Sequence, residues 1–155
     1  MQIEKRMAEL GIELPPPWNV PAQFNFVPVT ISGNMAYVSG HGPLKDGQVA
    51  YKGKLGREYG VQEGYEAARY TMLLMLASLK KTLGDLDRVV RVVKVLGMVN
   101  SAEGFDQQPA VINGASDLLV QIFGDEKGKH ARSAVGMAEL PFGIPVEIEM
   151  IVEVK

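Results

Sequence analysis

The sequence predicts a single α+β domain in which one mixed β-sheet carries two helices on one face. Three observations lead to this prediction. Two strand-length apolar runs flank a short turn at residues 32–34, two longer segments repeat apolar residues every third or fourth position, and the C-terminal segment alternates strictly. The expected order is β-β-α-β-α-β-β for residues 26–155, after an N-terminal helix and proline-rich arm at residues 1–25. Interleaved strands and helices of this kind favour a sheet with its helices on one side.

Length and charge narrow the class of protein. The chain has 155 residues, of which 46% are hydrophobic, and this suits one domain with its own core. The 16 basic and 18 acidic residues leave a net charge of −2, so the overall field does not favour nucleic acid as a partner.

The cysteine content and the hydrophobic segments bear on the cellular compartment of the protein and on the covalent bonds it can form. It has no cysteine, which excludes disulfides and thiolate metal sites and suits a cytoplasmic protein. No apolar run reaches the roughly 18 residues of a membrane span. The N-terminal segment alternates charges and lacks the apolar centre of a signal peptide, so we expect no membrane partner.

The N-terminal region predicts a helix followed by an irregular arm. Residues 2–10 place Ile3, Met7 and Leu10 on one stripe, which indicates a short helix. Residues 14–23 contain four prolines and are expected to be extended or irregular. Trp18 lies inside this arm, where its ring can either staple the arm to the domain or stack on a ligand.

A hairpin is expected next. Residues 26–31 and 35–39 read as two antiparallel strands joined by the turn at 32–34. Residues 40–43 end the second strand, and the polar, glycine-rich stretch 44–60 is expected to be a surface loop.

Two helices are predicted from apolar spacing. Residues 61–83 form the first, and residues 109–123 form the second, which has a proline in its first turn. The stripe expected to be buried in the first consists of Val61, Tyr65, Ala68, Met72, Met75, Leu79 and Leu83. The stripe in the second consists of Ile112, Ala115, Leu119 and Ile122.

The remaining strands suggest that the sheet is covered on both faces. Residues 89–99 are apolar on both sides apart from two basic residues, whereas residues 146–154 alternate between β-branched and acidic side chains. A strand begins at Arg132, after a charged loop at 124–129. Since the two helices cover one face only, the economical explanation is a homo-oligomer whose sheets face one another.

The residues that carry chemistry cluster at strand ends. No phosphate loop, nucleophile elbow or spaced metal-ligand set is present, so no metal site is predicted. Arg132 offers a planar fork suited to a carboxylate, Glu147 can orient or activate water, and Asn113 adds a neutral donor and acceptor. The backbone at Ser39 and Gly40 can supply N–H donors. The alternative is that Arg132 and Glu147 simply form an ion pair between adjacent strands.

Three segments together carry a family resemblance. Residues 33–43 (GNMAYVSGHGP), 131–135 (ARSAV) and 146–150 (VEIEM), in this order and with two helices between them, resemble the YjgF/Rid family, also labelled L-PSP endoribonuclease or translation-inhibitor-like. The longer arm and the loop at 43–60 resemble a longer subgroup. The resemblance implies a chorismate-mutase-like fold of the bacillus type and a homotrimer around a central barrel, with clefts between subunits.

The resemblance also implies an activity. Family members hydrolyse reactive enamines and imines, such as 2-aminoacrylate and 2-iminopropanoate, to 2-oxo acids and ammonia without a cofactor. By resemblance, Arg132 holds the substrate carboxylate and Glu147 positions water near the imine carbon. Asn113, Ser39 and Gly40 match positions that line the cleft.

The sequence departs from the family pattern at three positions. Phe26 stands where many deaminases have tyrosine, His41 where glutamine is common, and Ala134 where cysteine is common. Phe26 and His41 stay candidate substrate-binding residues. His41 can act as a proton donor, and the alternative is a loop histidine that only hydrogen-bonds. Two functions remain open, a deaminase and a binding protein that senses a 2-oxo acid. The acidic charge balance counts against a third, an endoribonuclease or translation inhibitor.

Overall fold

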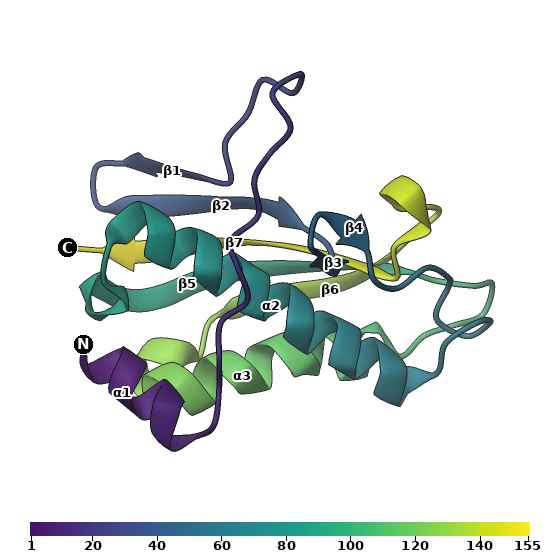
Figure 1. Cartoon of the computed structure of the whole chain (residues 1–155). Coiled ribbons are helices and arrows are strands. Elements are labelled where there is room, and N and C mark those ends of the chain that lie inside the picture. Colours follow the sequence, from purple (N-terminus) through teal and green to yellow (C-terminus); the bar gives the residue numbers. More distant parts are fainter.

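The computed structural model of the chain describes all of residues 1–155 and contains one five-stranded sheet and three helices (Figure 1). The strands of this sheet are β1 (Val29–Ser32), β2 (Met35–His41), β5 (Val89–Asn100), β6 (Ala131–Met137) and β7 (Val146–Val154). The helices are α1 (Gln2–Glu9), α2 (Val61–Leu83) and α3 (Gln108–Gly128). Two short 3₁₀ turns, η1 (Leu86–Arg88) and η2 (Pro141–Gly143), precede β5 and β7.

The sheet is mixed, and both long helices lie on one face of it, as the sequence predicted. Its strand order is β1-β2-β7-β5-β6; β5 and β6 run parallel, and every other neighbouring pair is antiparallel. Figure 1 shows α2 and α3 together below the sheet, with the opposite face free of helices. The predicted β-β-α-β-α-β-β order is therefore confirmed for the main sheet.

The second strand, expected at residues 35–39, continues to His41, and three larger differences from the prediction are found. The expected loop at 44–60 contains a small hairpin, β3 (Leu44–Lys45) and β4 (Gln48–Val49), because Asp46 and Gly47 take the positive φ values that a tight hairpin turn requires. The first strand begins at Val29, so Phe26 lies outside the sheet. The second long helix extends to Gly128, across a break at Gly124, where a loop was expected.

The predicted apolar stripes form the core between the helices and the sheet. In α2 the last five members of the stripe are buried, and only Val61 and Tyr65 at its N-terminal end are half-buried. In α3 all four predicted residues are fully buried. The buried face of β7 supplies the opposite wall, with Val146, Ile148, Met150, Val152 and Val154. Periodicity alone therefore located the core.

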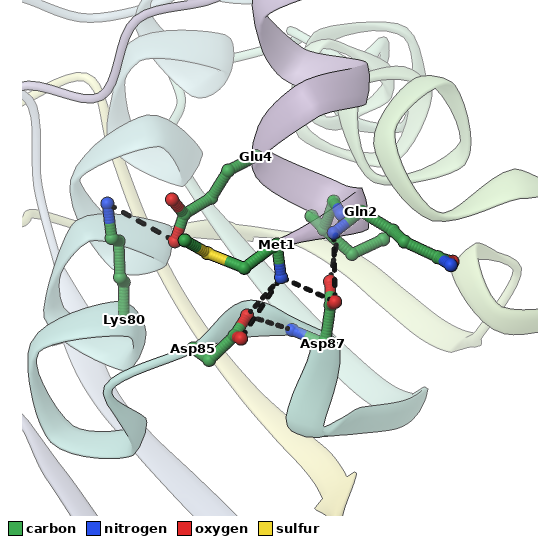
Figure 2. Close-up of polar contacts among 7 residues, drawn as sticks. Met1, Gln2, Glu4, Lys80, Asp85 and Asp87 are labelled. Atoms are coloured by element: carbon green, nitrogen blue, oxygen red, sulfur yellow. Dashed lines mark hydrogen bonds and ion pairs between the residues drawn. The ribbon is translucent and has the colours of Figure 1, made fainter.

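Helix α1 is docked through its N-terminal end (Figure 2). The Asp87 carboxylate accepts the backbone N–H groups of Gln2 and Ile3 at 2.9 and 2.8 Å, as a capping side chain does, and also binds the amino group of Met1. Glu4 pairs with Lys80 of α2 at 3.4 Å. These contacts fix the start of the arm that leads to Trp18.

The helix-free face of the sheet carries the polar side chains of β7 together with large apolar ones. Glu147, Glu149 and Glu153 alternate with the buried residues of β7, as predicted. Tyr37 and Val135 are 43% and 40% exposed on other strands. A shallow hollow of about 640 Å³ lies on this face. None of the helices combines the length and hydrophobicity that crossing a bilayer requires.

Candidate functional site

Arg132 is held by neutral oxygens and has no acidic partner. It lies in β6, and its guanidinium Nη1 donates to Asn113 Oδ1 at 2.9 Å and to Ser116 Oγ at 3.1 Å. Nη2 lies 3.5 Å from the backbone oxygen of Pro109, at the start of α3. None of the ion pairs in the structure involves Arg132. The side chain is thus oriented while its positive charge stays uncompensated.

A directed chain of hydrogen bonds continues behind Arg132. Ser116 Oγ lies 2.9 Å from His130 Nε2, and His130 Nδ1 lies 2.7 Å from the carbonyl oxygen of Gly128. Since a carbonyl only accepts, Nδ1 carries the proton and Nε2 accepts from the Ser116 hydroxyl, which in turn accepts from Arg132. Burial lowers the pKa of His130, and the nearby Arg132 charge lowers it further. The series of hydrogen bonds behind Arg132 therefore includes a neutral histidine.

Glu147 lies on the opposite face of the sheet, against Gly40. A Cβ built on Gly40 would stand 2.3 Å from Glu147 Oε2, so only glycine at this position lets the carboxylate lie over β2. Glu147 is half-buried, and burial raises its pKa, with a smaller contribution from the neighbouring charge of Glu149. This carboxyl group is consequently easier to protonate than an exposed glutamate.

An apolar pocket of about 310 Å³ opens beside Glu147. Its walls come from the N-terminal arm, the residues before β1, the end of β2 and the η2 turn. The lining residues are Trp18, Phe24, Phe26, Gly40, Gly42, Leu44, Pro141, Phe142, Ile144 and Glu147. Glu147 is the only ionisable side chain among them, so its carboxylate faces a space that favours apolar groups.

Ser39 and His41 flank Gly40 but point elsewhere. The Ser39 hydroxyl donates to the carbonyl oxygen of Val27 at 2.6 Å and so ties β2 to the residues before β1. His41 is 2% exposed, and its ring nitrogens contact the Ser39 carbonyl at 2.6 Å and Ser78 Oγ at 2.9 Å. The Trp18 ring packs edge-on against it at 5.1 Å. His41 therefore anchors the arm from within the core and does not line the pocket.

Within one chain, Arg132 and Glu147 belong to separate groups. Strand β5 separates β6 from β7, Arg132 is in register with the buried Val95, and Glu147 is in register with Met98 on the helix-free face. The two side chains lie on opposite faces of the sheet. The alternative interpretation, an ion pair between adjacent strands, is wrong because the strands are not neighbours and the charges do not meet.

The predicted site residues therefore fall into two sets. One set, the arginine side, joins Arg132 to Asn113. The other, the glutamate side, joins Glu147 to Gly40 and Phe26, with Ser39 bracing the same strand. Ala134 packs against the core beside the arginine side.

Sequence reasoning missed two contributors on the arginine side and two on the glutamate side. Ser116 and His130 come from α3 and the turn before β6, and no motif links them. Phe24 and Phe142 were overlooked because nothing in their local sequence distinguishes them from ordinary loop residues. The ring of Phe142 is 73% exposed and its φ is +60°, a conformation that only the folded structure reveals.

Comparisons with known proteins cover nearly the whole chain. Residues 4–150 match the family model described as "YjgF/chorismate mutase-like, putative endoribonuclease". Protein TCP17 of Trypanosoma cruzi is 44% identical over 154 residues, which span 99% of this chain and 95% of that protein.

Two solved structures resemble the chain over nearly its whole length. The protein Atu1372 from Agrobacterium tumefaciens, which is described as having unknown function, is 46% identical, with a TM-score of 0.88, covering 99% of this chain and 92% of that one. A structure from Shewanella oneidensis is 34% identical, with a TM-score of 0.90, covering 98% and 99%. The similarity thus includes the N-terminal arm as well as the sheet and helices.

Proposed function

The chain belongs to the YjgF/chorismate mutase-like family, and from this premise we propose that it hydrolyses small imines or enamines bearing a carboxylate, releasing a 2-oxo acid and ammonia. The proposed site is a cleft between copies of the chain in a homotrimer. One copy contributes Arg132 and Asn113, and its neighbour contributes Glu147, Ser39 and Gly40.

The observation that carries this proposal is the unpaired guanidinium of Arg132. A half-buried positive charge without a carboxylate partner is costly unless something else compensates it. Two neutral oxygens orient Nη1, and the guanidinium still has N–H donors free for a bidentate contact. A substrate carboxylate matches this fork in both charge and shape.

Glu147 supplies the second half of the chemistry. In the proposed reaction its carboxylate accepts a proton from a water molecule while the water oxygen attacks the imine carbon. Glu147 returns this proton to the nitrogen, which gives the neutral carbinolamine. The carbinolamine hydroxyl then loses its proton to the Glu147 carboxylate, which passes it to the nitrogen as the C–N bond breaks, so that ammonia leaves, the C=O bond forms and the carboxylate is regenerated. The raised pKa of Glu147 suits a group that must both accept and return a proton near neutral pH.

The separation of the two sets supports a site shared between copies. Arg132 and Glu147 lie on opposite faces of one sheet, so no small substrate can contact both within one chain. The helix-free face, with its exposed Tyr37 and Val135, is the surface that an oligomer would cover. An arrangement in which the arginine side of one copy meets the glutamate side of the next completes the site.

Replacing the anchor tests the proposal. Arg132→Ala should lower kcat/KM for 2-iminopropanoate by roughly 100- to 1,000-fold, because two charge-assisted hydrogen bonds to the substrate are lost. Arg91→Ala is the matched control, since Arg91 is an exposed arginine of β5 whose side chain makes one hydrogen bond, at 3.4 Å, to the carbonyl of Glu126. Absence of imine hydrolysis by the wild-type protein with any amino-acid-derived imine would overturn the proposal.

A binding protein is the second candidate, and Phe26 is the observation that favours it. Phe26 beside Glu147 has no hydroxyl, whereas many deaminases that the sequence resembles carry tyrosine there. Such a protein would bind a 2-oxo acid through Arg132 without turnover. Thermal stabilisation by a 2-oxo acid, lost in Arg132→Ala and unaccompanied by imine hydrolysis, would identify this function.

A further inference from the structure

The pocket beside Glu147 is walled by four aromatic rings, all of which come from outside the β-strands and α-helices. Trp18 and Phe24 belong to the N-terminal arm, Phe26 precedes β1, and Phe142 belongs to the η2 turn. Ring centroids of Trp18 and Phe26 are 5.7 Å apart, and those of Phe24 and Phe26 are 6.2 Å apart. Both spacings are typical of packed aromatic pairs. Trp18, Phe26 and Phe24 thus form a continuous apolar wall, and Phe142 lines the same pocket.

We propose that this wall selects the substrate, and that the preferred imines carry an aromatic side chain. The inference rests on the proposed function and names the substrate class of the same site. A volume of about 310 Å³ lies at the lower end of the roughly 300–1,000 Å³ typical of small-molecule pockets. It leaves room for one ring beyond the reacting carbon, which must lie near Glu147.

The chemistry of the wall excludes polar side chains. Glu147 is the only ionisable group facing the pocket, and the reaction engages its carboxylate. A hydroxyl or amide on the substrate would lose its hydrogen bonds to water and find few new partners, which costs binding energy. An aromatic ring loses nothing on leaving water and gains contacts with the surrounding rings.

The backbone conformation of Phe142 is a second, independent observation that assigns this ring a functional role. Phe142 is one of only two non-glycine residues with positive φ, at +60°, and its side chain is 73% exposed. A bulky residue rarely adopts this conformation, and an exposed ring offers the fold no packing in return. Its position at the pocket mouth, next to Pro141, gives it a role that the fold alone does not.

The arm is fixed well enough to serve as a wall. The Trp18 ring packs against His41, which Ser78 of α2 holds in the core, and Asn19 accepts a hydrogen bond from Lys81 of α2 at 3.3 Å. Figure 1 shows the arm rising from α1 past α2 to reach β1. A wall held at both of these points can discriminate between ring-sized and smaller side chains.

The test compares two imines on one enzyme. The imines of phenylalanine and alanine are generated in situ by an amino-acid oxidase, and the ratio of their kcat/KM values is measured. We expect a ratio of at least about tenfold in favour of the aromatic imine, the scale at which apolar pockets discriminate. In Phe142→Gly the ratio should fall severalfold, and thermal unfolding should confirm that the variant is folded, because glycine suits the positive φ.

Asp46→Gly is the matched control. Asp46 is the other non-glycine residue with positive φ, it lies in the β3–β4 turn, and it does not line the pocket. This variant should keep the wild-type ratio. Trp18→Phe is a second probe that shortens the wall without emptying it, and its ratio should lie between those of the wild type and Phe142→Gly.

Failure of this inference is distinguishable from failure of the proposed function. Hydrolysis of both imines at equal rates, or an unchanged ratio in Phe142→Gly, overturns the aromatic preference and leaves the deaminase intact. If neither imine is hydrolysed, thermal stabilisation by 3-phenyl-2-oxopropanoate and by pyruvate decides. Stronger stabilisation by the aromatic acid, lost in Phe142→Gly, upholds the preference, and equal or absent stabilisation overturns it.

Discussion

The two histidines make the same contacts in two different settings. In each, Nδ1 lies within hydrogen-bond distance of the carbonyl oxygen two residues earlier, at Ser39 for His41 and at Gly128 for His130. In each, Nε2 lies 2.9 Å from a serine hydroxyl on a long helix. Burial lowers the pKa of both rings and so favours their neutral form, and both tie the end or start of a strand to the helix packed on it.

The difference lies in what each histidine supports. The serine beside His130 also contacts Arg132, so that pair orients a positive charge on the arginine side. The ring of His41 instead contacts Trp18, so that pair fixes an apolar wall on the glutamate side. One local arrangement of hydrogen bonds thus serves two opposite chemistries. One half of the proposed site recognises charge, and the other excludes water.

The largest expected effect is on kcat, and it tests whether the arginine side and the glutamate side of one site come from different copies of the chain. Glu147→Gln alone should lower kcat by roughly 10²- to 10⁴-fold, because the amide cannot accept the proton from water. When Glu147→Gln and Arg132→Ala chains are refolded together, activity should recover to about one quarter of wild type. This follows because, in a cyclic oligomer, a random interface combines the intact arginine side with the intact glutamate side in that proportion.

The control for this experiment is a mixture that cannot complement. Arg132→Ala chains refolded with chains carrying both substitutions contain no intact arginine side, so they should stay inactive. Recovery in the first mixture but not in the second would assign the two sides to different copies. A first mixture no more active than its components would mean that each site lies within a single chain or lacks one of these groups.

Substitution of Gly40 should lower kcat by a smaller factor and should alter only the glutamate side. Gly40→Ala places a Cβ 2.3 Å from the position that Glu147 Oε2 occupies in the folded chain, so the carboxylate must move away. We expect kcat to fall roughly 10- to 100-fold, the scale of a catalytic group misplaced by about 1 Å. KM should change little, because the carboxylate anchor is on the other side.

Gly60→Ala is the matched control for Gly40→Ala. A Cβ on Gly60 would lie 3.7 Å from Glu63 Oε1, which is ordinary van der Waals contact with the same type of carboxylate. This variant should retain wild-type kcat. Equal kcat values for Gly40→Ala and the wild type would show that the position of the Glu147 carboxylate does not limit the reaction.

On both sides the sequence predicts some of the residues and misses others. The core and the succession of strands and helices along the chain followed from periodicity, which is a local signal, and Asn113 was placed with Arg132 through the family resemblance. Ser116 and Ser78 escaped prediction because each meets its histidine only after a helix has packed on a strand, 14 and 37 residues away along the chain. The aromatic wall escaped for the same reason, since its rings come from two separate connections, one between α1 and β1 and the other between β6 and β7.

The smallest expected effect is on the free energy of unfolding, which should depend on pH through both histidines. Burial lowers both pKa values below 6.5, so the unfolded state binds more protons as pH falls below that value, and the free energy of unfolding falls with it. The raised pKa of Glu147 acts in the opposite direction, because its folded form takes up a proton more readily. Chemical denaturation between pH 7.5 and 5, a range set on either side of about 6.5, measures the net slope.

Both histidines should contribute to the dependence of the free energy of unfolding on pH. Only His130 should also affect how firmly Arg132 is held. His41→Asn and His130→Asn should each flatten the dependence on pH, His41→Asn more strongly because His41 is the more deeply buried. His130→Asn should also raise KM severalfold, since Ser116 loses its acceptor and holds Arg132 less firmly. His41→Asn should raise KM less, because its serine does not contact the arginine. Equal increases in KM would show that the link through Ser116 does not orient the guanidinium, and the likeness of the two histidines would then extend to their function.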